Sequence, residues 1–410
     1  MNICILSDSP ALPTGYRNQA VQLVQYLEKK GHKVHYLANA FVGTTLDGIK
    51  LEDGTELKAK IHGSMFGQDY FANTMSQIFK DNQIDRFIIL LDTFMIFPWF
   101  LNIDTSPAKT YFWVPSDGGG GLPSGCENIL KKVDCPVSMS KFAQKQIKDY
   151  HGIDTKYIPL GIDTKRFFRL KDEERNILRN KWGLKDKFVI GVVARNQPRK
   201  NLDRTLKIMY LLKDRLPNAV LLLHMDPNDP AQQMFNFNKL IQRYNLENRI
   251  IFTGMKAYKG FAWDKMNELY NLMDVFLLTT SGEGFGIPIV EAMATETPVL
   301  ATGYTTTDEL ITETGAGLPI NLSGQPNYTN LLTLNSQEYD KICLDSTITG
   351  SWEVERGCCS IYDAVNKLVW LNDHQTECKI MGLNGRKNAV EFYDFEKIGS
   401  AWEELLCEQS

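Results

Sequence analysis

The chain has 410 residues, with 45 Lys and Arg against 49 Asp and Glu, so its net charge is −4. At roughly 150 residues per domain this length predicts two or three domains, and the apolar fraction of 43% excludes wholesale disorder. The mildly acidic balance excludes a global positive field that would collect nucleic acid or anionic lipid, but it leaves room for a local basic site.

The cysteines and the apolar segments favour a cytoplasmic location. None of the eight cysteines forms a C-x-x-C pair, and scattered thiols in a long chain are typical of a reducing compartment. The apolar start, Ile3–Leu6, is too short for a signal peptide. The most apolar stretch, Phe87–Leu101, is interrupted by Asp92 and Pro98 and is shorter than the ~20 residues that span a bilayer. We expect a buried strand and an aromatic loop there, and an exposed apolar patch for a lipid or acceptor is the alternative.

The first part of the chain alternates apolar runs with amphipathic segments. Val21, Val24 and Leu27 have helical spacing, which predicts a helix over Asn18–Lys30. The Asp53-Gly54 pair between alternating residues predicts an inserted hairpin. Strands are predicted at Asn2–Leu6, Lys33–Ala38, Arg86–Leu91, Thr110–Val114 and Cys135–Ser138.

A second unit with the same rhythm follows a charged stretch, residues 166–187. Its predicted strands are Phe188–Val193, Ala219–His224, Arg249–Thr253, Val275–Thr279 and Pro298–Ala301, with helices such as Leu202–Lys213 and Met234–Tyr244 between them. This alternation predicts two doubly wound, Rossmann-like α/β domains that are joined near residues 165–185 and enclose a cleft. Ligands bind beyond the carboxyl ends of parallel strands, so the residues after strands are the informative ones.

A glycine-rich loop after Val275–Thr279 predicts a ligand site. Three glycines flank Glu283 and Phe285, and Pro288 suits the first turn of a helix that starts near Ile287. Free amides at a helix start favour an anion, whereas the carboxylates of Glu283 and Glu291 favour the hydroxyls of a sugar and a ribose. A plain glycine-rich turn, with Glu291 facing the helix dipole, is the alternative.

A basic loop follows the strand Phe188–Val193. Arg195, Arg199 and Lys200 lie within six residues of each other, and three such cations could clamp a diphosphate and neutralise a leaving group. A solvated loop is the alternative for this triplet taken alone. The glycine loop on the same sheet edge favours the diphosphate site.

Together these motifs resemble the family-4 retaining glycosyltransferases of the GT-B fold, also described as glycosyl transferases group 1. The spacing of Glu283 and Glu291 matches the family's E-x7-E pattern, and Arg195 and Lys200 match its arginine and lysine pair. The segments 292–294, 297–301 with Glu309, and 158–167 also resemble family motifs, and the resemblance covers nearly the whole chain.

The resemblance implies a role for each motif. Glu283 would lie near the transferred sugar, the loop Gly284, Phe285 and Gly286 would offer backbone donors, and Glu291 would hold the ribose hydroxyls. Arg195 and Lys200 would hold the diphosphate. Domain 1–168 would bind the acceptor, domain 185–394 the donor, and a C-terminal helix, 395–410, would cross back onto the first domain.

Two departures from the family pattern concern the first domain. Its first loop has one glycine, Gly15, where members usually have two; Gly15 can still bring its amide near the donor phosphate. No histidine follows the strand Thr110–Val114, and Asp117 in a Pro-Ser-Asp-Gly segment is the candidate for that position. Asp117 would accept a hydrogen bond from a sugar hydroxyl or act as a base, and a plain turn aspartate is the equal alternative.

The implied reaction transfers a sugar, with retention and without a metal or other cofactor, from a UDP- or GDP-sugar to an acceptor hydroxyl. No metal-ligand cluster stands out in the sequence. Donor hydrolysis or phosphorolysis, and a catalytically silent binding protein, are the alternatives. The acceptor, be it a glycan, a lipid-linked sugar, a protein or another hydroxyl, is left open, as is a peripheral membrane contact.

Overall fold

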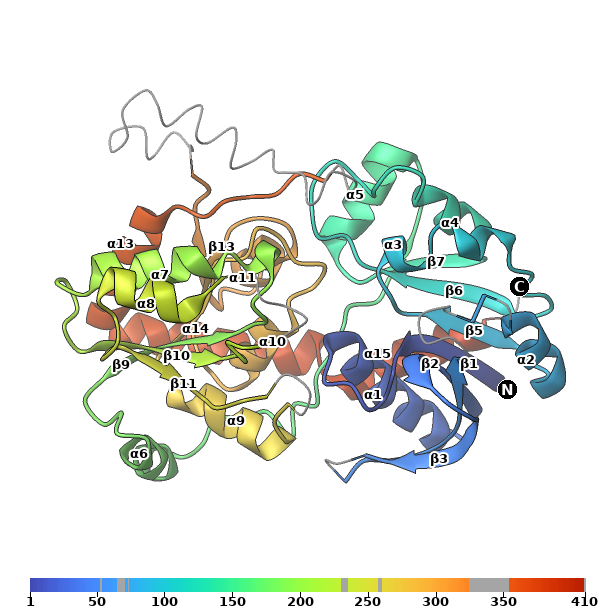
Figure 1. Ribbon diagram of the computed structural model, residues 1–410, viewed down its shortest axis with the longest axis horizontal. Helices are drawn as coiled ribbons and strands as arrows, with labels where there is room; N and C mark the ends of the chain where they lie inside the picture. The colour runs from blue at the N-terminus through green and yellow to red at the C-terminus, as the bar shows by residue number, and fades with distance from the viewer. Residues whose placement is uncertain are drawn as a thin grey trace.

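The computed structural model describes residues 1–51, 54–64, 71–72, 74–229, 235–256, 260–323 and 354–408. These residues form two α/β lobes that lie side by side, the N-terminal lobe in blue to green and the C-terminal lobe in green to orange (Figure 1). Each lobe is built on its own sheet, as expected for the GT-B architecture. The sheets lie within the ranges 1–168 and 185–394, and the boundaries themselves stay a prediction.

The N-terminal sheet has the strand order β3-β4-β2-β1-β5-β6-β7-β8 within the described residues. All neighbouring pairs are parallel except β3 with β4. The strands are β1 (Asn2–Asp8), β2 (Lys33–Val42), β3 (Leu46–Lys50), β4 (Glu56–Ser64), β5 (Arg86–Ile89), β6 (Lys109–Val114), β7 (Cys135–Ser138) and β8 (Lys156–Tyr157). The antiparallel pair β3–β4 confirms the inserted hairpin, although Asp53 of its expected turn lies outside the described residues.

Helices join these parallel strands, as right-handed crossovers require. They are α1 (Gly15–Lys29), α2 (Met75–Asn82), α3 (Thr93–Ile96), the 3₁₀ turn η1 (Trp99–Asn102), α4 (Glu127–Lys132) and α5 (Lys141–His151). The aromatic loop expected after β5 therefore contains two short helical turns. Phe100 is fully buried and Phe94 is exposed, so most of this segment packs into the lobe.

The C-terminal sheet is parallel throughout, in the order β11-β10-β9-β12-β13-β14. Its strands are β9 (Phe188–Val193), β10 (Ala219–His224), β11 (Ile250–Phe252), β12 (Val275–Leu278), β13 (Val299–Thr302) and β14 (Gly317–Ile320). The five predicted strands of this lobe agree with β9 to β13 to within one residue at each end. Short apolar runs between turn residues thus sufficed to locate five strands of this parallel sheet, whereas the edge strand β14 was not predicted.

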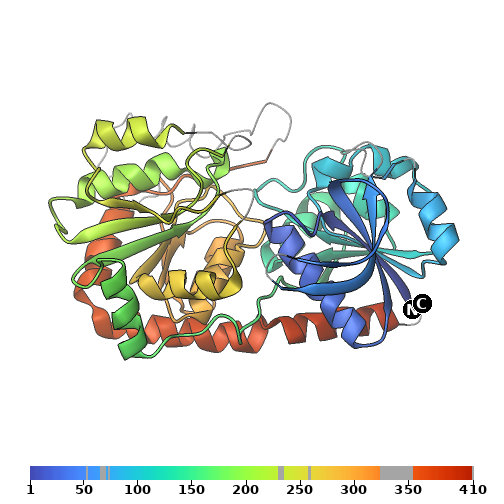
Figure 2. The same cartoon turned by 60° about the horizontal axis from the view of Figure 1, so that its bottom comes forward.

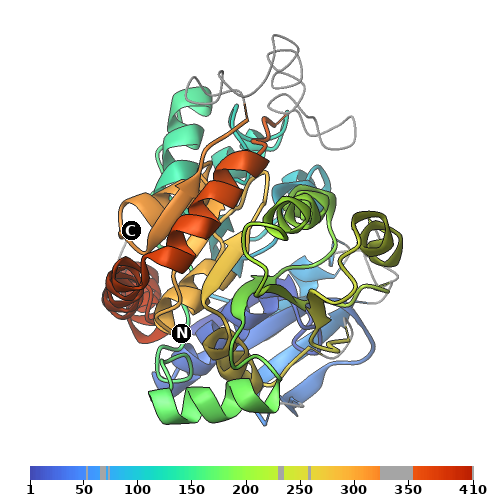
Figure 3. The same cartoon turned by 90° about the vertical axis from the view of Figure 1, so that its left-hand side faces the viewer.

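Helices cover both faces of this sheet, as the end view shows (Figure 3). One face packs on α7 (Leu202–Leu212), α8 (Phe237–Tyr244) and α13 (Ile361–Asp373) in a core of its own. The other face packs on α9 (Trp263–Leu272) and α10 (Ile287–Ala294) in a core that continues into the N-terminal lobe. The remaining helices are α6 (Asp172–Lys181), η2 (Pro198–Lys200), α11 (Thr306–Thr312), α14 (Gln375–Phe392) and α15 (Phe395–Cys407).

The last two helices tie the lobes together. α14 and α15 run end to end along both lobes (Figure 2). On the N-terminal lobe Trp402 is fully buried, with its ring 5.0 Å from that of Trp113 and 6.3 Å from that of Tyr111. Gly399 allows α15 to pack closely on this lobe, because a Cβ at this position would come within 2.4 Å of the ring of Tyr26.

A helix lies in the joint between the lobes. The charged stretch between the lobes contains the helix α6, whose Arg179 binds Asp274 beside β12, so this stretch packs on the C-terminal lobe.

No helix in the described part of the chain combines the length and apolarity needed to cross a membrane. The seven cysteines among the described residues are free thiols, and Cys343 lies outside them.

Candidate active site

The basic loop after β9 is held against the loop after β12. The turn η2 ends at Asn201, which has a positive φ of 48° and starts α7. Thr279 donates its hydroxyl to the backbone oxygen of Lys200 at 3.0 Å, and Ser281 N donates to the oxygen of Arg199 at 2.7 Å. Because β9 and β12 are neighbours in the sheet, their carboxyl ends bring these two loops together.

The glycine loop leads into α10 at the residue expected. Gly286 has a φ of +99° and precedes the first helical residue, Ile287. Pro288 stands in the first turn, where it costs no hydrogen bond. Thr305, after β13, accepts a hydrogen bond from the backbone N–H of Glu283 at 3.0 Å. Three adjacent strand ends therefore fix the position of the Glu283 side chain.

Glu283 is the centre of a buried ionic network. Its Oε1 accepts from Lys200 Nζ at 2.5 Å, and its Oε2 accepts from Arg199 Nη1 at 2.7 Å. Arg199 Nε also lies 3.3 Å from Oδ2 of Asp117, and Oδ1 of Asp117 accepts from Arg356 Nη2 at 2.8 Å. The charges alternate along this chain of side chains from Arg356 to Lys200. Three cations face two carboxylates among these five side chains.

Burial and pairing shift the pKa values within the network. Burial would raise the pKa of Glu283, but Arg199 and Lys200 overcome it and lower the value to about 2. Burial lowers the pKa of Lys200 to about 8, with Arg199 adding to the effect and Glu283 opposing it. Burial would lower the Arg199 pKa too, but the two carboxylates raise it. At neutral pH Glu283 is therefore ionised and Lys200 is mainly protonated.

Asp117 comes from the opposite lobe, three residues beyond the end of β6. The approach is close, because a Cβ on Gly282 would come within 2.0 Å of the Asp117 carbonyl oxygen. A Cβ on Gly284 would come within 3.0 Å of Pro115. The glycines of the loop thus serve first to bring the carboxyl edges of two sheets into contact.

Glu291 lies one turn into α10 and away from this network. Its Oε2 accepts a hydrogen bond from the hydroxyl of Tyr270 at 2.6 Å. Burial raises the pKa of Glu291 to about 7, although the hydrogen bond from Tyr270 opposes the shift. The Phe285 side chain is also buried, 5.8 Å from the ring of Tyr393, so only its backbone is left to face a ligand.

The remaining predicted residues lie at the first loop. Gly15 is the first residue of α1, and a Cβ there would meet nothing within 4 Å. Arg195 Nη2 lies 3.4 Å from the carbonyl oxygen of Pro13, so the basic loop reaches this first loop as well. Pro13 also touches the C-terminal lobe at Gly260, whose Cβ would come within 2.9 Å of it.

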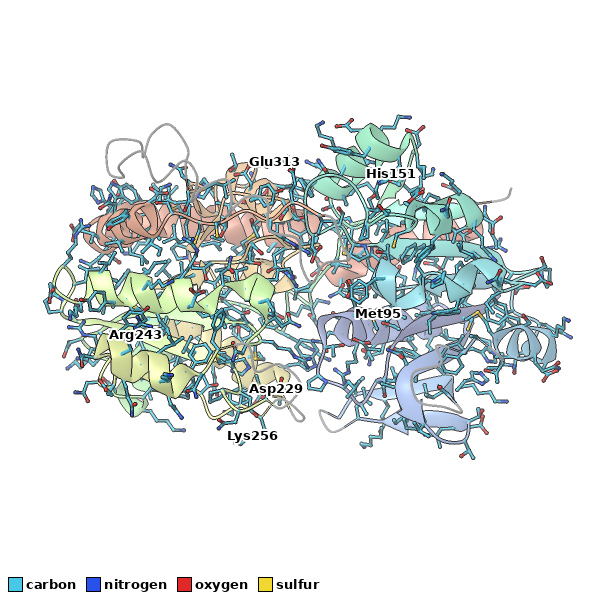
Figure 4. All side chains as sticks on the ribbon, turned by 45° about the horizontal axis from the view of Figure 1, so that its top comes forward. Met95, His151, Asp229, Arg243, Lys256 and Glu313 are labelled. Atoms are coloured by element: carbon cyan, nitrogen blue, oxygen red, sulfur yellow. The ribbon has the colours of Figure 1, made fainter. Side chains whose placement is uncertain are left out.

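A second contact between the lobes lies beside the site. Glu309 of α11 accepts the backbone N–H groups of Lys141 and Phe142 at 3.2 and 2.9 Å, at the start of α5. Lys141 also pairs with Glu313, which is labelled on the C-terminal side of this junction in Figure 4. A carboxylate from one lobe therefore caps a helix of the other.

Three residues that the structure brings into the site, Arg356, Tyr270 and Asp92, carry no motif in the sequence. Arg199 was predicted only as one of the three cations of the basic loop. Asp92 follows β5 and accepts from Tyr16 at 2.6 Å, and burial raises its pKa to about 6 despite this hydrogen bond, with Asp117 adding to the shift. The one available signal for Asp92 and Arg199 is their position after a strand.

No group of three or more His, Cys, Asp or Glu side chains within the described ranges is arranged to hold a metal ion.

Two Rossmann-like domains whose strand ends meet at a charged junction define the GT-B architecture, and solved structures agree. Sucrose-phosphate synthase from Thermosynechococcus elongatus superposes with a TM-score of 0.74 at 16% identity, covering 99% of this chain and 98% of that one. Anabaena HepE, solved in complex with UDP-glucose, superposes with a TM-score of 0.65 at 16% identity over 99% of both chains.

Residues 174–323 match the family described as glycosyl transferases group 1. Mannosylfructose-phosphate synthase of Agrobacterium fabrum is 31% identical over 163 residues, 38% of this chain and 34% of the enzyme. A GDP-mannose-dependent phosphatidylinositol monomannoside mannosyltransferase of Mycobacterium tuberculosis is 27% identical over 206 residues, 47% of this chain and 51% of that protein. The matches to the first curated relatives span about a third or less of those proteins, 34% and 22%.

Proposed function

We propose that this protein is a retaining glycosyltransferase that moves a sugar from a nucleoside-diphosphate sugar to an acceptor hydroxyl without a metal ion. The observation that carries the proposal is the pairing of Glu283 with Lys200 and Arg199, at 2.5 and 2.7 Å, where the two sheets meet. The match of residues 174–323 to the glycosyl transferases group 1 family supports the same reaction class.

The network suits a leaving group whose negative charge grows during the reaction. As the bond between the sugar C1 and the diphosphate oxygen breaks, the charge on that oxygen is stabilised by the fixed positive charge of Lys200 and of the arginines. These cations are already held by Glu283 and Asp117, so little reorganisation is needed in the transition state.

Retention follows if the acceptor attacks from the face that the diphosphate leaves. The acceptor oxygen then forms its bond to C1 while its proton passes to the departing phosphate oxygen. This route requires positioning and charge stabilisation from the protein more than a protein base. The two oxygens of Asp117 already accept from Arg199 and Arg356, which supports an electrostatic role for Asp117 over that of a base.

The remaining residues of the candidate site bind the nucleotide-sugar donor in this proposal. Arg195 and Lys200 hold the diphosphate, Glu291 holds the ribose hydroxyls, and the amides of Gly15, Phe285 and Gly286 face phosphate or sugar. HepE was solved with UDP-glucose, and the mycobacterial relative depends on GDP-mannose, so UDP- and GDP-sugars are the first donors to test. The acceptor is bound by the N-terminal lobe.

The test screens UDP-, GDP- and ADP-sugars for binding by calorimetry and by thermal shift, since a bound ligand raises the apparent stability. The selected donor is then incubated with and without hydroxyl acceptors, in the presence and absence of EDTA. We expect a product with retained anomeric configuration by NMR, formed at the same rate with EDTA. Free sugar as the sole product would indicate a hydrolase, and no nucleotide binding would indicate a silent scaffold; either result contradicts the proposal.

A further inference from the structure

A short segment of the C-terminal lobe, residues 354–357, lies between the two loops of the candidate site. On one side Glu355 forms an antiparallel bridge with Gly119, through N–H···O bonds of 2.9 and 3.1 Å. On the other side Gly357 N donates to the Ser281 oxygen at 2.9 Å. We call residues 354–357 the strap, because its backbone joins the Asp117 loop of one lobe to the Glu283 loop of the other.

The backbones can approach because glycine stands at the crowded positions. A Cβ on Gly118 would come within 2.7 Å of the Glu355 oxygen, and one on Gly357 within 2.7 Å of the Tyr304 ring. The hydroxyl of Tyr304 accepts from Gly119 N at 3.1 Å and donates to the Glu355 oxygen at 3.2 Å. The strap is thus packed into the junction with a definite register.

Arg356 is the charged residue of the strap that reaches the ionic network. Its side chain is only 4% exposed, and it donates to both the carboxylate and the carbonyl oxygen of Asp117. Its Nε has no hydrogen-bond partner among the described residues. Burying an arginine with a donor unpaired is costly, and such costs are typical of positions held for function.

We infer that Arg356 is a positioning residue for sugar transfer, which holds Asp117 and, through Arg199, sets Glu283 and Lys200 when the two lobes are closed. This inference rests on the proposed function. The family match ends at Ser323, so Arg356 lies outside the segment that the family model assigns. Within the described part of the chain, Arg356 is hydrogen-bonded to the network at Asp117, and it acts on the other side chains through Asp117.

The effect of Arg356 follows from the alternation of charges. Without it, Asp117 is neutralised by Arg199 alone, and Arg199 is drawn toward Asp117 and away from Glu283. Lys200 then becomes the main partner of Glu283 and is less available to the diphosphate. The displacement of Arg199 also raises the pKa of Lys200, which is held at about 8 by burial and by Arg199.

The experiment compares Arg356→Met, Arg356→Lys and a matched control, Arg215→Met, which removes an exposed arginine bonded to Asn366 on the same lobe. For each variant we measure donor affinity by calorimetry, kcat and KM, and the pH profile of kcat/KM. For Arg356→Met we expect donor affinity within about threefold of wild type, kcat reduced at least tenfold, and the alkaline limb moved to higher pH. Arg356→Lys should return the alkaline limb of the kcat/KM profile to its wild-type position. The control Arg215→Met should leave donor affinity, kcat, KM and the pH profile unchanged.

A second measurement needs no substrate and covers the case in which a variant is destabilised. Amide hydrogen exchange of the ligand-free protein should become faster in Arg356→Met at the segments 117–119 and 281–284, and stay unchanged in Arg215→Met. Unchanged exchange at 281–284, or a pH limb that stays in place while kcat is normal, overturns the inference. A wild-type protein that binds and transfers no sugar donor overturns the proposed function, with the catalytic part of this inference, whatever the exchange data show.

Discussion

Lys200 and Glu283 lie on loops after neighbouring strands, and their side chains meet at 2.5 Å in a buried ion pair. Arg199 binds the other oxygen of Glu283, so one carboxylate organises two cations. Desolvation of the two charges offsets much of the electrostatic attraction in so deeply buried an ion pair. The main effect of the pair is therefore to fix the positions of its side chains. We therefore expect its members to matter more for turnover than for stability at neutral pH.

The first prediction concerns Lys200. Replacing Lys200 with Ala should raise the barrier to transfer by ~2.7–4 kcal/mol, or roughly 10²–10³-fold in kcat, as for loss of a preorganised donor in comparable sites. Steady-state kinetics with the selected donor measure this. Lys265→Ala, on the exposed surface of α9 beside Glu268, is the control and should be silent. A normal kcat for Lys200→Ala would rule out its role at the diphosphate.

The second prediction concerns acid stability. The pKa of Glu283 in the folded protein, about 2, is below its ordinary value of 4.5, so the unfolded chain binds the proton more readily. Its contribution is present above pH 4.5 and is lost as the pH falls toward 2, on the order of 3 kcal/mol. Denaturant unfolding of wild type and Glu283→Gln between pH 2 and 7 should show a stability difference that narrows over this window. If the difference in unfolding free energy between wild type and Glu283→Gln does not change with pH, the lowered pKa of Glu283 is contradicted.

The third prediction concerns Glu291 and the nucleotide. Because burial raises the Glu291 pKa to about 7, half of the ligand-free molecules carry a protonated carboxyl near neutrality. A ribose that donates its hydroxyls to the carboxylate lowers this pKa, so binding releases a proton and strengthens as the pH rises through 7. Calorimetry at pH 6.5 in buffers of different ionisation enthalpy measures the release. Glu291→Gln should abolish it, and equal release in that variant would assign the proton elsewhere.

The fourth prediction contrasts two glycines. A methyl group on Gly15 meets no atom within 4 Å, whereas one on Gly282 would come within 2.0 Å of the Asp117 oxygen. Gly15→Ala should therefore keep the melting temperature, and with the donor phosphate placed beside Gly15, as proposed, it should weaken donor binding. Gly282→Ala should lower the melting temperature and separate the loops. Thermal unfolding and calorimetry check both, and unchanged donor affinity in Gly15→Ala would remove Gly15 from the site.

The fifth prediction concerns the crossing helix α15. Trp402 is fully buried against Trp113, and its replacement by Ala should cost about 3–5 kcal/mol of unfolding free energy. Denaturant titration followed by tryptophan fluorescence measures the loss. Lys397→Ala, on an exposed position of the same helix, should change the stability by less than about 0.5 kcal/mol. A small loss for Trp402→Ala would mean that α15 contributes little to the N-terminal lobe.

The fold could be predicted from the sequence because its signals are local. Apolar runs such as Phe188–Val193 and Ala219–His224 are strands in the structure over those same residues, and Ile287 starts its helix as the glycines and Pro288 indicated. These patterns arise from the strand and helix periods and from turn residues, which depend on neighbours in the chain. The joint near residues 165–185 stays a prediction, and the helix α6 lies within it.

The candidate site could be predicted only in part from such local sequence signals. Glu283, Lys200 and Asp117 could be named because each follows a strand, and parallel strands bring their carboxyl ends to one edge. Arg356 could not, because it is 239 positions from Asp117 in sequence and no periodic pattern marks it. The sequence by itself determined the two mainly parallel sheets and the loops at which the charged side chains gather. Only the tertiary structure decided which charges pair, because pairing depends on how two separately folded edges meet.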